Sequence, residues 1–78
     1  MKLSKTITHV QVAKDCELEL HILYKSASNY DIDEVYCDGK LIPMSLFKVM
    51  AEESAIDFDD EAGRAVAKEI FEIMNNRS

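Results

Sequence analysis

Residues 16–25 alternate between apolar and polar side chains, which is the two-residue period of a strand with one face in water. The apolar positions are Cys16, Leu18, Leu20, Ile22 and Tyr24, and the polar positions are Glu17, Glu19, His21 and Lys25. This pattern predicts a strand over about 17–25.

The preceding segment predicts a second strand, over about 5–12, because it is rich in β-branched residues. A polar turn at 13–15 would let the two strands pair antiparallel. Ile7 has the opposite parity to Val10 and Val12, so the sequence predicts a bulge near Thr8. A third strand is expected over about 32–37, ended by the turn signal Asp38-Gly39.

After this turn the period becomes helical. A first helix is predicted over about 45–54, with Pro43 at its approach and Ser45 as its cap. A second is predicted over about 58–75, with Asp57 as a candidate cap and Asp60 three residues later. One stripe of this helix should lie on the sheet, formed by Phe58, Ala62, Val66, Ile70 and Ile73.

Phe71 does not belong to that stripe. It lies roughly 160° from the centre of the stripe, beside Ala67 and Met74. We expect a second contact face here, which would pack on the first helix through Phe47 or Met50, or else on another subunit or partner.

These segments predict an α+β domain over residues 1–78, in which a three-stranded antiparallel sheet is followed by two helices packed on one face. The element order is β-β-β-α-α. No linker or internal repeat divides the chain. Three strands permit more than one order, so the sequence leaves open which strand is central.

Charge is unevenly distributed along the chain. The formal net charge is −6. Residues 1–30 hold four lysines and three acids, so residues 31–78 carry a net charge of −7. This argues against direct binding to nucleic acid or to an anionic membrane, whose phosphates attract cations. A charged partner should therefore be a protein with a basic surface.

The N-terminal residues lack the apolar run of a secretory signal, and no segment reaches the eighteen apolar residues of a membrane helix. We therefore expect a cytoplasmic protein. Cys16 and Cys37 are expected to be reduced, buried thiols, although a bridge between them is possible.

Signals for catalysis, a cofactor or a metal are weak, so we expect none of these. His9 and His21 would lie on the polar sides of neighbouring strands and could approach one another, but Cys16 has the opposite parity to His21. A calcium loop beginning at Asp57 fails, because Lys68 stands where the twelfth position needs glutamate.

The acids themselves are the remaining candidate for function. Six lie between Glu52 and Glu61 without a base among them. Such a run either solubilises a loop or forms an acidic docking surface, to which acids near residue 31 could add. The candidate partner-binding residues are Asp31, Asp33, Glu34, Glu52, Glu53, Asp57, Asp59, Asp60, Glu61 and Phe71.

The layout as a whole resembles short accessory proteins of bacteriophages and prophages. The resemblance lies in the alternating strand at 17–24, the polar bend, the strand with its Asp38-Gly39 turn, and the acid-rich helices. It implies no site residues. It does imply a class that includes inhibitors of host defence or nucleic-acid enzymes, several of which act through acidic surfaces that mimic nucleic acid.

Two functions follow as hypotheses. The first is a non-enzymatic protein-binding module, such as a phage-type inhibitor of a host defence or nucleic-acid-handling protein, that acts through its acidic surface. The alternative is a small structural or assembly protein that forms a homo-oligomer through the Phe71 face of its last helix.

Overall fold

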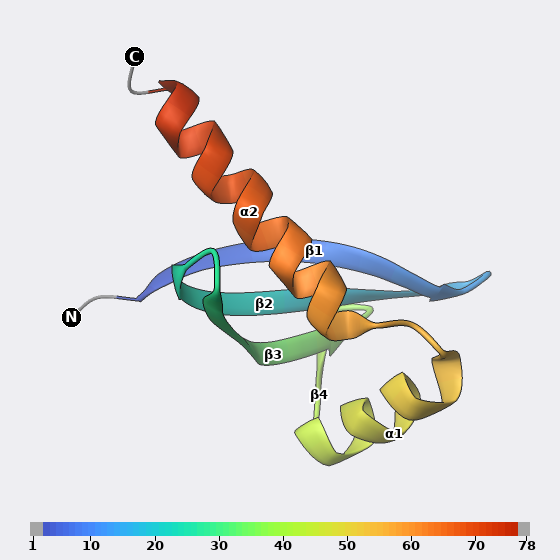
Figure 1. Ribbon diagram of the computed structural model, residues 1–78. Coiled ribbons are helices and arrows are strands. Elements are labelled where there is room, and N and C mark those ends of the chain that lie inside the picture. Colours follow the sequence, from blue (N-terminus) through green and yellow to red (C-terminus); the bar gives the residue numbers. More distant parts are fainter. Residues whose placement is uncertain (1–2, 77–78) are drawn as a thin grey trace.

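A computed structural model describes residues 3–76 and contains one antiparallel sheet followed by two helices (Figure 1). The α+β layout is as predicted, but the sheet of the described chain has four strands rather than three. The elements are β1 (Ser4–Ala13), β2 (Cys16–Ser26), β3 (Asn29–Cys37), β4 (Lys40–Ile42), α1 (Met44–Ser54) and α2 (Phe58–Asn76).

The additional strand β4 is a product of the Asp38-Gly39 turn. Both turn residues have positive φ, 52° and 79°, as a type I′ hairpin turn requires. The turn folds the chain back so that Val35 pairs with Ile42. Three residues are too few to show a period of two, which is why the sequence pattern did not reveal this strand.

Strand order, which the sequence left open, is β1-β2-β3-β4. Each connection between consecutive strands is a two-residue hairpin, so each strand pairs with the next one along the chain. As a result β2 and β3 are central, and β1 and β4 form the two edges.

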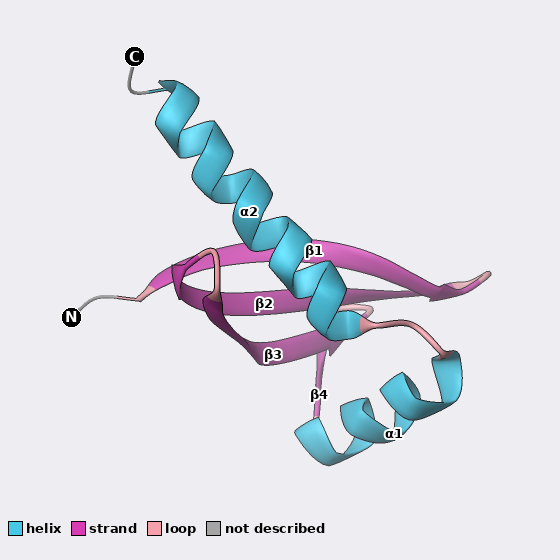
Figure 2. Ribbon diagram, viewed as in Figure 1, coloured by secondary structure: helices cyan, strands magenta, loops and turns pink. Residues whose placement is uncertain are grey.

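α2 crosses one face of the sheet, and α1 lies beside the β3–β4 edge (Figure 2), where its Phe47 joins the same hydrophobic core. The face of β2 beneath α2 supplies Leu18, Leu20 and Ile22, whose side chains are fully buried. Val35 of β3 and Val66 of α2 are also fully buried. The opposite face, which we call the outer sheet face, carries the other set of alternating residues and is not covered by a helix.

The predicted bulge near Thr8 is wrong. Pairing between β1 and β2 is continuous from Ser4 to Gln11, and Ile7 lies on the outer sheet face with 48% of its surface exposed. Register irregularities occur instead beside the two hairpins that flank β2, at Gln11–Ala13 and at Tyr24–Ser26, and as a bulge within β3. His21 pairs with Glu34 and Ile22 with Ile32, so Asp33 is an extra residue that allows both Ile32 and Val35 to face the helices.

Helix α1 begins at Met44, directly after Pro43, and no side chain caps its N-terminus. The prediction that Ser45 caps this helix is therefore wrong, because Ser45 already lies within its first turn. Pro43 replaces it, since its fixed φ suits a helix start. The helix ends at Ser54, and the next residue, Ala55, takes the left-handed conformation with φ of 59°.

Helix α2 begins as predicted, with the Asp57 carboxylate accepting a hydrogen bond from the Asp60 backbone N–H at 3.1 Å. Phe58, Ala62 and Val66 from the predicted stripe are buried, and Ile70 is half-buried against the core. Ile73 is 42% exposed, contrary to its predicted place on the sheet. The reason is that the C-terminal end of α2 extends past the sheet (Figure 1).

Candidate functional site

The acids around the connection from α1 to α2 form a cluster that we call the acidic junction. It consists of Glu52, Glu53, Asp57, Asp59, Asp60 and Glu61. All except the half-buried Glu61 are exposed. The four acids near the start of α2 are favoured there by the positive end of the helix dipole. Glu52 and Glu53 occupy the negative end of α1, where the dipole disfavours them. Helix stability therefore does not explain these two.

Little of this charge is neutralised within the described chain. Arg64 Nε lies 3.0 Å from Asp60 Oδ2, and both side chains are more than half exposed. An ion pair this exposed contributes little to stability and leaves the carboxylate available to a partner. It is the only ion pair that the described residues form with the acidic junction.

Tyr30 attaches the acidic junction to the sheet. Its hydroxyl donates a hydrogen bond to the backbone carbonyl of Asp59 at 3.3 Å. Partial burial and the nearby carboxylates, of which Asp59 has the largest effect, raise the pKa of Tyr30 above its ordinary value of 10.0. A side chain at Gly63 would place Cβ 2.6 Å from this hydroxyl, so glycine is needed for α2 to approach β3 so closely.

The β3 acids face a different direction from the acidic junction. Asp31 pairs with Leu23 and Glu34 with His21, and both partners belong to the outer sheet face. Asp33 is the exposed bulge residue between them. The structure therefore places the six acids of the junction on either side of the α1–α2 connection, and Asp31 and Glu34 on the side of the sheet away from the helices.

Phe71, the tenth candidate, is 64% exposed near the end of α2. It does not pack on α1, which corrects that expectation. The aromatic partner of Phe47 is instead Phe58, with ring centroids 4.9 Å apart and planes at 69°. Phe71 thus remains available to another subunit or partner.

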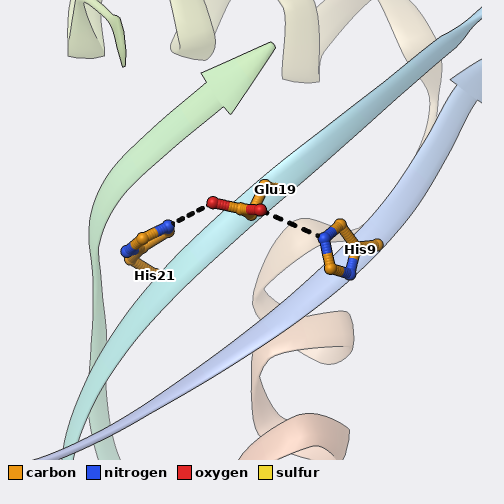
Figure 3. Close-up of polar contacts among 3 residues, drawn as sticks. All are labelled: His9, Glu19 and His21. Atoms are coloured by element: carbon orange, nitrogen blue, oxygen red, sulfur yellow. Dashed lines mark hydrogen bonds and ion pairs between the residues drawn. The ribbon is translucent and has the colours of Figure 1, made fainter. Parts of the chain in front are cut away.

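A polar cluster that sequence reasoning only partly anticipated lies on the outer sheet face (Figure 3). His9 Nε2 lies 3.2 Å from Glu19 Oε1, and His21 Nε2 lies 2.6 Å from Glu19 Oε2. Alternation on β2 and the cross-strand pairing of His9 with Glu19 bring these three side chains together. The possible approach of the histidines was recognised, but not the glutamate between them, because the pairing register was unknown.

The geometry of this cluster does not suit a metal. Figure 3 shows the two imidazoles on opposite sides of Glu19, each directed at one carboxylate oxygen. Within residues 3–76 no group of three or more His, Cys, Asp or Glu is arranged to hold a metal ion. The ring of His21 packs on that of Tyr36 at 4.6 Å, so the cluster is a structural element of the outer sheet face.

Acidification should weaken this cluster. Hydrogen bonds from His21 and His9 hold the pKa of Glu19 below its ordinary value of 4.5. Because the folded pKa is the lower one, the stabilisation is complete above about pH 5 and is lost as the pH falls through the folded pKa. The urea midpoint of the wild type should exceed that of Glu19→Gln near pH 7, and the difference should shrink toward pH 3. A difference that is constant with pH would contradict this.

The two cysteines are free thiols, with Cys16 Sγ and Cys37 Sγ 3.9 Å apart in a half-buried position. The hydrogen bond with Cys16 raises the pKa of the Cys37 thiol above its ordinary value of 9.0, and burial has a second, smaller effect in the same direction. A raised pKa keeps the thiol protonated at neutral pH and so lowers its reactivity.

Two hollows on the described surface have volumes of about 170 and 260 Å³. Both are smaller than the roughly 300 to 1,000 Å³ of typical small-molecule sites. The first lies between β1 and α2, and the second between the β1–β2 hairpin and the end of α1.

Within residues 3–76, no helix combines the length and the apolar character needed to cross a membrane. Comparison of the chain with protein-family models, with curated proteins and with solved structures gives no match.

Proposed function

We propose that this chain is a non-enzymatic binding protein whose acidic junction engages a basic surface on a protein partner. The observation that carries the proposal is the set of six carboxylates that flank the α1–α2 connection, five of them exposed and only Asp60 paired with a cation among the described residues. Two of them, Glu52 and Glu53, lie where the helix dipole opposes them.

Such a surface acts mainly on the encounter between two proteins. A concentrated negative field attracts a cation-rich surface, accelerates association and sets the orientation, while salt weakens the attraction. Proteins that bind nucleic acids carry Lys- and Arg-rich surfaces that neutralise phosphates. We therefore favour a nucleic-acid-handling protein as the partner, which this chain would inhibit by occupying its phosphate-binding groove. The resemblance to phage accessory proteins supports the same choice, with a host defence protein as one form of the target.

The test is affinity capture from bacterial lysate at about 50 and 500 mM salt with two triple variants of equal charge change. One replaces Glu52, Glu53 and Asp59 with lysine, which spares the Asp57 cap. The matched control replaces Asp31, Asp33 and Glu34 with lysine. We expect a basic partner that is retained at low salt, is lost at high salt, and is lost by the junction variant alone.

Equal retention by both variants would overturn the proposal, because the acidic junction would then play no part in binding. Equal loss would also overturn it, since the effect would come from net charge rather than from this surface. Circular dichroism and urea unfolding of both variants would verify that each is folded before the capture is compared.

A further inference from the structure

We propose that two copies of this chain form a dimer through the free edge of β1, with the projecting end of α2 from each copy packing across the interface. This contact does not use the acidic junction, so it is independent of the function proposed above. Three features of the described chain support it: a long unpaired strand edge, an uncovered apolar helix end and a strand without acids.

The edge is the first feature. β1 is ten residues long and lies at the end of the sheet, so the outward-pointing backbone N–H and C=O groups have no strand partner among residues 3–76. Natural proteins protect such edges with proline, charged side chains, a bulge or a very short strand. β1 contains no proline and a single lysine, Lys5, and its one irregularity lies at the hairpin end, between Gln11 and Ala13, so its pairing with β2 is regular from Ser4 to Gln11. It is therefore a template for another strand.

The helix end is the second feature. α2 crosses above the sheet and continues beyond β1 (Figure 1). Phe71, Ile73 and Met74 on this end are 64%, 42% and 67% exposed. A groove of about 170 Å³ separates Thr6 and Thr8 of β1 from Lys68 and Glu72 of α2, so the strand edge and the helix end open to the same side. A partner at the edge would lie beneath this end of the helix.

A second copy fits both features. Antiparallel pairing of β1 with β1 is self-complementary, because a two-fold axis perpendicular to the sheet places each edge against the same edge of its partner. The same axis keeps the helices of both copies on one face of an eight-stranded sheet. Each projecting α2 end would then extend over the partner.

A stable interface buries about 800 Å² per partner, about a seventh of the 5729 Å² surface of this chain. A strand edge alone is narrow, so the helix ends are needed to reach this area.

Charge is compatible with self-association at this edge. Two copies with a net charge of −6 repel unless their contact avoids the acids. β1 contains no Asp or Glu, and the other edge strand, β4, also lacks acids but is only three residues long. The acidic junction comes near β1 only at its hairpin end, where Glu53 borders the hollow beside Val12 and Ala13. Lys68 lines the groove together with Glu69 and Glu72, so this part of the proposed interface contains both signs of charge.

The test combines sedimentation equilibrium with amide hydrogen exchange, both measured from about 1 to 300 µM. We expect a monomer–dimer equilibrium in the wild type, in which alternate amides of β1 become protected as the concentration rises. Phe71→Asp and Met74→Asp should each raise the dissociation constant at least about tenfold. Val49→Asp is the matched control, because Val49 is 49% exposed on α1, away from this edge, and its dissociation constant should not change.

A wild type that stays monomeric over this range would overturn the proposal. A strand of a different protein would then be the expected pairing partner of the β1 edge. A dimer whose β1 amides stay unprotected, or one that Val49→Asp weakens equally, would also overturn it. Circular dichroism would show that the Asp variants remain folded, as their exposed positions predict. The Phe71→Asp variant should retain salt-dependent capture by the acidic junction, which separates this proposal from the previous one.

Discussion

Phe58→Ala should lower the free energy of unfolding by about 3 to 5 kcal/mol, measured by urea unfolding monitored by circular dichroism. Phe58 is 5% exposed, and its ring packs edge-on against Phe47, the only buried residue of α1. The substitution removes both the buried ring and the main attachment of α1. A domain of this size has about 5 to 10 kcal/mol of stability, so the substitution should remove a large share of it.

Phe58→Leu is the matched control for this change. Leucine keeps most of the buried volume but loses the ring-to-ring contact, so the cost should be below about 1.5 kcal/mol. Amide exchange within α1 should accelerate strongly in Phe58→Ala and only slightly in Phe58→Leu. If the alanine variant were as stable as the leucine variant, the Phe47–Phe58 contact would not be what holds α1.

Leu20→Ala is expected to cost about 2 to 5 kcal/mol for a different reason, because it opens a cavity in the middle of the sheet. Leu20 is fully buried and pairs with Thr8 on one side and with Val35 on the other. Neighbours fixed in a regular sheet relax little, so the cavity should persist. The measurement is again the urea midpoint, with the slope of the transition unchanged.

Leu41→Ala provides the comparison, since the same side chain is 59% exposed on the edge strand β4. A change within about 0.5 kcal/mol is expected there. Equal costs at Leu20 and Leu41 would contradict the assignment of the core to the helix-covered face of the sheet.

The one-sided architecture connects these expectations with the two proposals. α2 covers one face of the sheet with α1 beside it, and the acidic junction lies where the chain passes from one helix to the other. The β1 edge and the α2 end lie away from it, so a partner and a second copy would not compete for the same surface. The proposed function and the proposed dimer can therefore be tested separately in the same preparation.

The candidate site was predictable to the extent that it is local in sequence. The six acids of the junction are separated by at most a few residues, and the Asp57 cap depends on a residue three positions away. The face of the sheet on which Asp31 and Glu34 lie is not a local property. It depends on the bulge at Asp33, which forms only when β3 pairs with β2. The His9–Glu19–His21 cluster depends on pairing register in the same way.

The sequence by itself determined the strand at residues 16–25, the second helix with its cap, and the concentration of acids after residue 50, because periodicity, capping and charge are local properties of the chain. Only the tertiary structure decided the strand order, the position of the bulge and the packing of Phe58 rather than Phe71 against Phe47. These features depend on which segments meet and in what register. Contacts between residues far apart in the chain set that outcome, and a pattern along a single strand or helix does not contain it.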